Sequence, residues 1–467
     1  MCGICGLLQM PGGQPVSGEL LERMNDLIRH RGPDDAGSYI SPDGRVGMAN
    51  RRLAIIDPSP AGRQPLSNES GSIWIAYNGE TYNFAELRAE LQAQGHVFRS
   101  QTDTEVVVHL YERYGVECVQ HMRGMFAFAI WDESERRLIL ARDRLGVKPL
   151  YYAFAPDAFL FASEIKCLLA HPRLPRAVDD EAFYHFLTFL TAPAPQTLFK
   201  GILKLPPGHL AVVNAEGEIT VEEYWDVFSS GKPVTALSAA EQAERVQAAL
   251  RESIKLRMVS DVPFGVLLSG GIDSSTNVAL MAAQMERPVQ TFSIGYKGTA
   301  VDEFNELHYA RKVADRFGAD HHEILIGRED LTNFLPDLIY HQDEPIADPV
   351  CVPVHYVCKL AKESGTTVVQ VGEGADELFG GYRHWLAALR LHKGAWPFFG
   401  ALPGWARRLA LEVATPLLDD LRREYLRRGA SGEELFWGGA IAFGEGSKRA
   451  LLTDSFLRGV RGLSSHQ

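Results

Sequence analysis

The sequence predicts a chain of two parts, an α+β part rich in short strands followed by an α/β part built on a parallel sheet. At 467 residues the chain is longer than one hydrophobic core usually supports. Short apolar runs bounded by turn residues fill the first half, and strands alternate with helical segments in the second. The polar stretch FSSGKPVTALS at 228–238 separates them, so we expect domains at 2–228 and 239–467.

Composition excludes several classes of protein. The net charge of −12 argues against a broad basic surface for nucleic acid. There is no run of 18 apolar residues, so no membrane span is expected. Pro11, Gly12 and Gly13 interrupt the short apolar run that a secretory signal would need. Six irregularly spaced cysteines favour a reduced, cytoplasmic protein. With the charge and the apolar pattern, this means that neither nucleic acid nor membrane is an expected partner.

The first part combines strands with a few helices. The apolar or alternating runs lie at 73–77, 125–131, 138–141 and 159–162. Asn83 followed by Glu86 predicts a capping box that opens a helix ending near Gly95. These patterns do not determine the strand order.

The second part has the alternation typical of a parallel sheet with helices on both faces. A helix at 239–258 precedes the strand VPFGVLL, and a helix beginning near Ser274 follows it. The strands PVQTFSI, HHEILI and TVVQV come later, with a helix at 303–317 after the first of them. Glycine-rich loops follow VPFGVLL and TVVQV, at the strand ends where such sheets bind ligands.

The first glycine-rich loop, GVLLSGGIDSS at 265–275, has the character of a phosphate site. Glycines let the backbone approach an anion, and free N–H groups at a helix start point toward it. Asp273 would repel a bare phosphate, but it suits a Mg²⁺ that bridges carboxylate and phosphates. The second loop, VGEGADELFGGY at 371–382, adds Asp376 as a second expected Mg²⁺ ligand. The alternative is that SGG is a plain turn and the acids cap helices; neither loop is a Walker A or a dinucleotide motif.

These loops and the N-terminus resemble known families. SGGIDSS resembles the signature of ATP pyrophosphatases, and together with GEGADELFGGY it is similar to the synthetase domain of glutamine-dependent asparagine synthetases. MCGICG resembles the start of class II glutamine amidotransferases, and HRGPD, RRLAIID, YNGETYN and QTDTE follow in family order. The resemblance runs from Cys2 to about Tyr382 and implies an N-terminal-nucleophile αββα sandwich followed by a pyrophosphatase-loop domain.

The resemblance implies that Met1 is removed and Cys2 becomes the nucleophile. Only a terminal residue carries both a thiol and a free α-amine, whose pKa near 8 lets it serve as the base. Asn78 and Gly79 would stabilise the oxyanion. His30 is expected to be structural, and Cys5 is not expected to pair with Cys2.

The resemblance also assigns the substrates. Glutamine would be held by Arg52, Asn78, Glu80 and Asp103, with Arg52 on its α-carboxylate and Asp103 on its α-amine. ATP and Mg²⁺ would serve the second part, where aspartate would be adenylated and then amidated, with Glu373 handling protons. The expected ATP contacts are Leu267, Ser269, Gly270, Gly271, Asp273, Ser274, Ile294, Gly372 and Glu373.

Each residue also has a simpler structural interpretation. Arg52 could pair with Asp34, Asn78-Gly79 could be a type I′ hairpin turn, and Asp103 could cap the helix that starts at Thr104. Other functions also stay open: amidation of another carboxylate in a polysaccharide or antibiotic pathway, a β-lactam-forming synthetase, a glutaminase with an inert second half, or a non-catalytic partner protein. The assembly is also open, with a homodimer among the options.

One departure from the family pattern concerns the C-terminal region. The family's synthetase domain carries a lysine in a K-x-D-R-x-S-M stretch, followed by E-x-R-x-P-F-L-D, and the residues after Tyr382 contain neither. We therefore expect a chain truncated relative to the family, with weak or absent synthetase activity. Val371 also stands where many members carry a hydroxyl residue before GEGADE.

Overall fold

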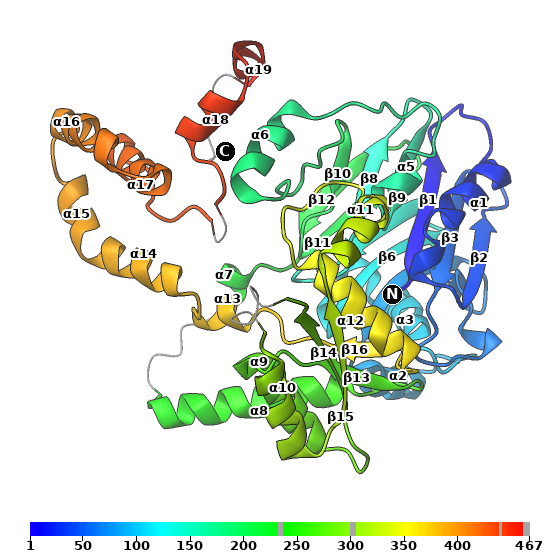
Figure 1. Ribbon diagram of the computed structural model, residues 1–467. Coiled ribbons are helices and arrows are strands. Elements are labelled where there is room, and N and C mark those ends of the chain that lie inside the picture. The colour runs from blue at the N-terminus through cyan, green and yellow to red at the C-terminus, as the bar shows by residue number, and fades with distance from the viewer. Residues whose placement is uncertain (232–236, 299–304, 439–440, 461–467) are drawn as a thin grey trace. The chain divides into compact units, whose positions relative to one another are not determined.

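The computed structural model describes residues 1–231, 237–298, 305–438 and 441–460 (Figure 1). The chain divides into two compact units, which are described separately below. The first comprises residues 1–176, 201–343 and 351–371, and the second comprises the described residues of 177–200, 344–350 and 372–467. Part of the expected linker, 232–236, lies outside the described residues, and the short helix α7 (Val227–Ser230) precedes it. The expected domain boundaries stay a prediction.

Two antiparallel sheets of six strands form most of the first unit. Their strand orders are β10-β8-β9-β1-β3-β2 and β12-β11-β7-β6-β5-β4. The strands are β1 (Gly3–Gln9), β2 (Asp35–Ile40), β3 (Val46–Arg52), β4 (Leu66–Ser67), β5 (Ile73–Thr81), β6 (Gly124–Asp132), β7 (Arg137–Arg142), β8 (Tyr151–Phe154), β9 (Ala158–Ala162), β10 (Ile202–Lys204), β11 (His209–Val213) and β12 (Ile219–Glu223).

The two sheets share one core. Ile4 and Leu8 of β1 belong to the same cluster of buried side chains as Ala127 and Trp131 of β6. Successive side chains of a strand point to opposite faces, so these residues mark the inner face of each sheet. The strand patterns of the sequence had left the strand order of both sheets undetermined.

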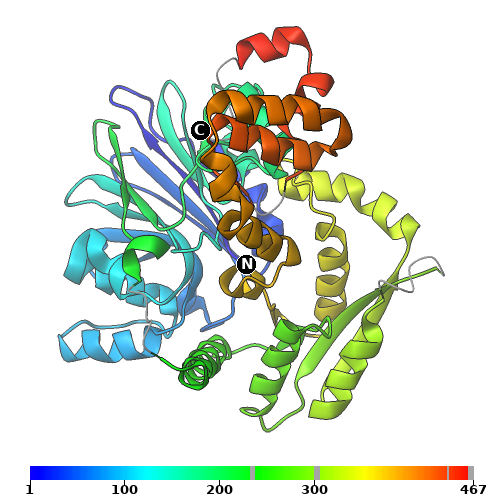
Figure 2. The same ribbon diagram turned by 90° about the vertical axis from the view of Figure 1, so that its left-hand side faces the viewer.

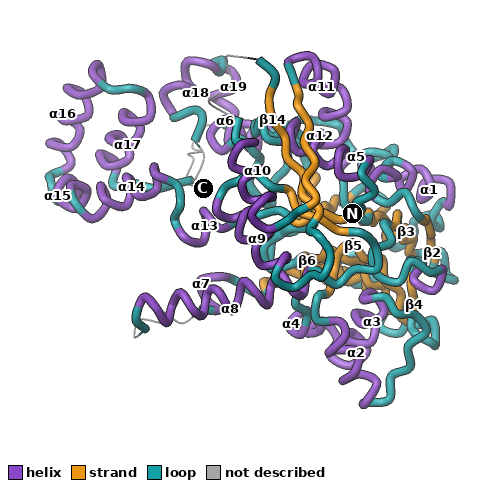
Figure 3. The backbone as a smooth tube through the Cα atoms, turned by 60° about the horizontal axis from the view of Figure 1, so that its bottom comes forward, coloured by secondary structure: helices purple, strands orange, loops and turns teal. Residues whose placement is uncertain are grey.

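Helices cover the outer faces of both sheets. The helix α1 contacts β1 and β3, and it buries Leu21 and Met24. The helices α2 and α3 lie side by side and pack on the second sheet (Figure 3). The order helix, sheet, sheet, helix confirms the expected αββα sandwich. The helices of this part are α1 (Gly18–Asp26), α2 (Phe84–Ala93), α3 (Asp103–Tyr114), α4 (Cys118–His121) and α5 (Ile165–Leu168), with 3₁₀ turns η1 (Arg29–Arg31), η2 (Pro60–Gly62) and η3 (Gly115–Glu117).

A four-stranded parallel sheet completes the first unit, in the order β15-β14-β13-β16. Buried side chains from α8, α9 and α10 pack on one face, and those from α11 and α12 pack on the other (Figures 1 and 2). This confirms the predicted α/β architecture. The elements are α8 (Ala239–Arg257), β13 (Phe264–Leu267), α9 (Ile272–Ala282), β14 (Gln290–Tyr296), α10 (Leu307–Phe317), β15 (Asp320–Ile326), α11 (Arg328–Gln342), α12 (Cys351–Glu363) and β16 (Val368–Gln370).

One local prediction is wrong, and the starts of two other predicted helices are located more closely. The Asn83 side chain does not cap α2: it donates to the carbonyl of His121 (3.0 Å) and accepts from the N–H of Arg123 (2.9 Å), so a tertiary contact replaces the capping box. The helix expected from Ser274 begins at Ile272. The helix expected at 303–317 is described from Leu307, and 299–304 lie outside the described residues.

The second unit is helical where the structure describes it, as the sequence predicts for the tail. No described helix of the chain is long and apolar enough to cross a membrane. The helices of this unit are α6 (Asp180–Phe189), α13 (Ala375–Phe379), α14 (Arg383–Lys393), α15 (Ala395–Gly400), α16 (Gly404–Ala414), η5 (Thr415–Leu417), α17 (Asp420–Ser431), α18 (Glu445–Leu451) and α19 (Asp454–Gly459).

Candidate active site

Cys2 stands at the entrance to β1, and contacts from other segments hold it. Its Sγ accepts a hydrogen bond from the N–H of Leu53 (3.4 Å), and its carbonyl accepts one from Nε of Arg31 (3.0 Å). A Cβ on Gly3, the next residue, would lie 2.9 Å from Cδ1 of Ile28, so a larger residue there would displace the Ile28 side chain. Burial raises the pKa of the Cys2 thiol, which makes a nearby base necessary for attack.

The amino terminus has the properties of that base. Burial lowers the pKa of the Met1 amine to about 6, so this amine is mostly neutral at pH 7. Removal of Met1 would transfer the amine to Cys2 itself, beside the thiol.

Asn78 and Gly79 lie within a strand. They belong to β5, where Asn78 is opposite Ala127 and Gly79 is opposite Phe126, which excludes the hairpin-turn alternative. A Cβ on Gly79 would lie 2.4 Å from the carbonyl oxygen of Met125, so only glycine fits there.

The side-chain amide of Asn78 is buried, and its polar atoms are unpaired among the described residues. The residue is 0% exposed, and among the described residues neither Oδ1 nor Nδ2 has a hydrogen-bond partner. An unsatisfied buried polar group costs about 1–3 kcal/mol, so such groups are rare unless they have a function. A buried amide with free polar atoms is what an oxyanion site requires before substrate arrives.

Two carboxylates lie near Cys2. Asp103 is the first residue of α3, and its Oδ2 accepts from the N–H of Thr81 (2.8 Å). Thr102 caps the helix instead, which rules out the capping alternative for Asp103. Burial raises the pKa of Asp103 to about 6, and burial together with the Asp103 charge raises that of Glu80 well above its usual value. Both acids act on the thiol, since their charges raise the pKa of Cys2.

Arg52 is buried beside this pocket, with its terminal nitrogens bonded to the backbone. Its guanidinium donates to the carbonyls of Ser59 (3.2 Å), Ile56 (3.1 Å) and Asp57 (2.6 Å). The described residues contain no ion pair between Arg52 and Asp34; the Asp34 carboxylate accepts from Ala54 N–H instead (2.9 Å). The guanidinium thus braces the loop after β3, and its role as a carboxylate clamp stays a prediction.

Lys148 is a residue that sequence reasoning missed. Its side chain is 4% exposed, and burial lowers its pKa while the charges of Glu80 and Cys2 raise it. The Lys148 N–H donates to Oδ2 of Asp143 (2.9 Å), which fixes the loop that carries it. No local sequence pattern around Lys148 predicts that its side chain is buried.

His30 is structural, as expected. Its Nε2 lies 2.8 Å from Oε1 of Glu164, which also accepts from Nη1 of Arg31 (2.9 Å). Although burial raises it, the bond from His30 and the charges of Arg31 and Lys166 lower the pKa of Glu164 to about 2. Glu164 thus anchors Arg31, whose Nε holds the Cys2 carbonyl.

Asp343, at the end of α11, is paired with Lys166. Its Oδ1 lies 3.0 Å from Nζ of Lys166, and its Oδ2 accepts from the Lys166 N–H (3.1 Å). The neighbouring Tyr340 donates from its hydroxyl to the carbonyl of Leu27 (3.3 Å). These contacts lie within the first unit and join the end of α11 to the sandwich.

The loop after β13 has the form of a phosphate site. Gly270 has φ +86°, and a Cβ there would lie 2.6 Å from Cβ of Tyr309, so glycine is required. Ser269 and Ser274 bond to each other through their hydroxyls (3.0 Å), which closes the loop. Gly271 is the N-cap of α9 and supplies no side-chain cap, so the first N–H groups of the helix stay available to an anion.

The other expected nucleotide contacts lie on neighbouring elements. Leu267 ends β13, half-buried Ile294 lies in β14, and half-buried Asp273 is the second residue of α9. The parallel pairing puts Leu267, the last residue of β13, opposite Phe292 of β14, two residues before Ile294. The structure therefore brings these residues to one edge of the sheet, as predicted.

The second glycine-rich loop belongs to the second unit. Gly374, with φ +89°, precedes α13, and a Cβ on Gly381 would lie 1.9 Å from Oδ1 of Asp376. Glu373 and Asp376 are exposed, and Gly372 is half-buried. Asp273 and Asp376 thus lie in separate units, and their pairing around Mg²⁺ stays a prediction.

Comparison with known proteins agrees with this division of sites. A family model described as a glutamine amidotransferase domain matches residues 1–225, and one described as asparagine synthase matches residues 245–445. The glutamine-hydrolysing asparagine synthetase 1 of Bacillus subtilis (strain 168) is 38% identical over 456 residues, covering 97% of this chain and 70% of that protein. The chain belongs to the family of glutamine-hydrolysing asparagine synthetases.

As a member of this family, the chain is a glutamine-dependent carbon–nitrogen ligase whose synthetase part uses ATP. A putative glutamine-hydrolysing asparagine synthetase of Mycobacterium tuberculosis (strain H37Rv) is 34% identical over 471 residues, covering 97% of this chain and 71% of that protein. Among solved structures, the glutamine PRPP amidotransferase of B. subtilis with ADP and GMP has a TM-score of 0.37 at 17% identity, covering 79% of this chain and 81% of that one. The fold assignment rests on the layers and strand orders above.

Proposed function

We propose that this asparagine synthetase family member amidates aspartate with ammonia released from glutamine, through an acyl-adenylate. The observation that carries the glutaminase half is the buried Asn78 amide, which has no hydrogen-bond partner among the described residues and lies in the same domain as the Cys2 thiol and the Met1 amine. The closed loop with an uncapped helix start supports the ATP half.

Glutamine hydrolysis begins at Cys2. Its thiol attacks the side-chain amide carbon, and the α-amine accepts the thiol proton. The tetrahedral oxyanion is stabilised by Nδ2 of Asn78 and the N–H of Gly79. Collapse of this intermediate transfers a proton to the leaving nitrogen, releases ammonia and leaves a glutamyl thioester. Water then hydrolyses the thioester to glutamate and restores the thiol.

Charged side chains hold the glutamine backbone. Asp103 and Glu80 attract the α-ammonium group, and Arg52 supplies positive charge toward the α-carboxylate. The buried acids are costly to ionise without a cation beside them, so the bound ammonium offsets that cost.

ATP binds the loop from Ser269 to Ser274, with Leu267 and Ile294 at the nucleoside and Gly372 and Glu373 contributing from the second loop. Asp273 and Asp376 would hold Mg²⁺, which neutralises phosphate charge when bound. The aspartate side-chain carboxylate attacks the α-phosphorus, pyrophosphate leaves, and ammonia then displaces AMP. Glu373 accepts a proton as the amide forms.

The deciding experiment is a product assay with glutamine, ATP and a panel of carboxylate acceptors. Asparagine, AMP and pyrophosphate formed in equal amounts from aspartate support the proposal. Amidation of another acceptor with aspartate left unchanged would replace aspartate as substrate. If glutamate is released but no acceptor gives ATP turnover, the 467-residue chain acts as a glutaminase alone. Light scattering of the same sample tests whether the chain forms a homodimer.

A further inference from the structure

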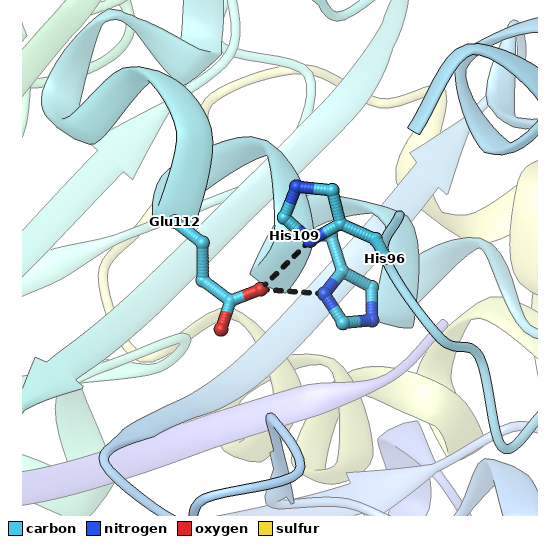
Figure 4. Close-up of side chains that lie close together, drawn as sticks. All are labelled: His96, His109 and Glu112. Atoms are coloured by element: carbon cyan, nitrogen blue, oxygen red, sulfur yellow. Dashed lines mark hydrogen bonds and ion pairs between the residues drawn. The ribbon is translucent and has the colours of Figure 1, made fainter. Parts of the chain in front are cut away.

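A cluster of metal-ligating side chains lies apart from both candidate sites, on the outer helices of the sandwich. His96 follows α2, and His109 and Glu112 lie one turn apart on α3 (Figure 4). The Oε2 of Glu112 is 3.2 Å from Nδ1 of His96 and 2.6 Å from Nδ1 of His109. One ligand atom from each of the three residues lies within 4.8 Å of the others. Two imidazoles and a carboxylate are a ligand set that zinc prefers.

The second ring nitrogen of His109 is an independent sign of a ligand. The side chain is 1% exposed, and Nε2 has no hydrogen-bond partner among the described residues; Oε1 of Glu105 lies 4.0 Å away. If Nδ1 donates its proton to Glu112, Nε2 is a buried acceptor facing a carboxylate, which is unfavourable. If Nδ1 binds a metal, the proton moves to Nε2 and faces Glu105, as in carboxylate–histidine–zinc arrangements.

The surroundings already orient the ligands. Oε1 of Glu112 accepts from Nδ2 of Asn68 (2.8 Å), which leaves Oε2 for the histidines. The Glu105 carboxylate is itself fixed, by the N–H groups of Arg99 and Ser100 (both 2.8 Å). Such second-shell partners are what metal sites use to fix their ligands.

The distances require only a small adjustment. Zinc bonds of about 2.0–2.2 Å in a tetrahedron separate neighbouring ligand atoms by roughly 3.3 Å. The pair at 3.2 Å already fits this spacing, and the pair at 2.6 Å needs to open by less than about 1 Å. The side chains of His96 and Glu112 are 20% and 21% exposed, so water can reach the fourth position.

We propose that His96, His109 and Glu112 bind a zinc ion. The ion would tie the segment after α2 to α3, and α3 begins with Asp103 in the glutamine pocket. Its role would be structural, because the cluster contains neither the thiol nor the oxyanion residues.

The test uses the full chain carrying Cys2→Ala, so that zinc cannot bind the catalytic thiol. After treatment with a chelator, the chain is titrated with Zn²⁺ in a calorimeter. We expect one equivalent to bind, and Glu112→Gln and His96→Gln each to weaken binding at least tenfold. His209→Gln is the matched control, since that imidazole contacts a backbone carbonyl, that of Pro207 (2.7 Å), and it should leave binding unchanged.

Two further measurements test the zinc site, one of thermal stability and one of the ligand atoms. Zinc should raise the melting temperature of the Cys2→Ala chain and fail to raise that of the folded Glu112→Gln variant. X-ray absorption at the zinc edge should show nitrogen and oxygen ligands without sulfur. Absence of stoichiometric binding, or equal affinity in the parent and in Glu112→Gln, would overturn the site. None of these readouts depends on glutamine or ATP turnover.

Discussion

The Cys2 pocket is made from buried side chains, whereas the loop from Ser269 to Ser274 is made largely from backbone at the surface. Asn78 is 0% exposed and Asp103 is 5% exposed, while Ile272, the first residue of α9, is 85% exposed. The pocket keeps polar groups at shifted pKa values in a dry environment before any substrate arrives. The loop offers N–H groups and one carboxylate to water.

The two sites therefore differ in how much of the binding site is formed before the ligand binds. In the pocket the fold has already supplied the free energy of desolvation, so removal of one group leaves a specific chemical defect. In the loop from Ser269 to Ser274, the backbone conformation is already formed, but the site is complete only when the nucleotide and its cation bind. Substitutions of Cys2 and Asn78 should therefore act on kcat for glutamine hydrolysis, and those in the loop should act on ATP affinity.

The largest expected effect is that of Cys2→Ala. Loss of the thiol removes the covalent path, so glutaminase activity should fall by roughly 10³-fold or more. Synthesis driven by added ammonium chloride should be spared, since the loop does not use the thiol. Parallel assays of glutamate release and ammonia-dependent AMP formation check this. Loss of both activities in a folded variant would show that the two regions are not separable.

The role of the terminal amine is tested separately, by mass spectrometry of the active protein. Active protein that retains Met1 would contradict that role.

Asn78→Ala should come next, with kcat for glutamine hydrolysis lowered by about 10²–10³-fold and KM nearly unchanged. Because the amide makes no hydrogen bond to any described residue, stability should change little. Asn83→Ala is the matched control: its side chain holds two backbone groups, so it should cost about 1–2 kcal/mol of stability without a comparable fall in kcat. Steady-state kinetics and urea unfolding of both variants separate these outcomes. Unfolding of Asn78→Ala with no kinetic defect would make Asn78 a structural residue.

Gly270→Ala should weaken ATP binding by roughly tenfold or more, because the new Cβ would meet Cβ of Tyr309 and the backbone of Ala310. Glutamine hydrolysis should be unaffected. Gly318→Ala is the control, with positive φ (+61°) but open space around it, and should cost only about 1 kcal/mol of stability. Equilibrium binding of a nucleotide analogue measures the difference. Equal ATP affinity in the two variants would remove this loop from the nucleotide site.

The smallest expected effect is a pH dependence of glutamine binding. Asp103 must be ionised to hold an ammonium group, and its pKa is about 6. The KM for glutamine should therefore rise as pH falls below 6, by up to about tenfold per unit. A KM independent of pH between 5 and 7 would contradict ammonium binding by Asp103.

The same pKa has an opposite consequence for stability. A carboxyl whose folded pKa is raised stabilises the fold below its unfolded pKa near 3.8, and this contribution is lost as pH rises through about 6. Asp103→Asn should therefore stabilise the ligand-free chain at pH 7, by about 1–3 kcal/mol. Urea unfolding at pH 5 and pH 7 measures the gain. A variant less stable than the parent at pH 7 would show that the hydrogen bond to Thr81 outweighs the cost of the charge.

Patterns local in sequence predicted the elements well. Strand periodicity located β5, β6, β7 and β9, and the alternation of strands and helices predicted the parallel sheet. The glycine-rich run at 265–275 predicted a strand, a turn and a helix start because glycine is needed at Gly270, where φ is positive. Periodicity and backbone sterics act over a few residues, so they can be read without the fold.

Patterns whose outcome depends on distant partners were less predictable. Asn78-Gly79 is a strong turn signal that instead lies mid-strand, because β6 pairs along it. Asn83 is a good cap residue whose side chain is taken by His121 and Arg123. Lys148 is buried by the folded sandwich and lies close enough to Glu80 and Cys2 for their charges to affect its pKa.

By itself, the sequence determined the parallel sheet of the chain, and it predicted a phosphate loop at 265–275 and a nucleophile at position 2. These features depend on residue type and spacing, and the family resemblance adds to them. Only the tertiary structure decided that Asn78 has no hydrogen-bond partner in the described part of the chain, that Arg52 is bonded to backbone carbonyls, and that two histidines share Glu112. Burial and hydrogen-bond partners come from segments far apart in the chain, and no local pattern encodes which groups will be left unpaired.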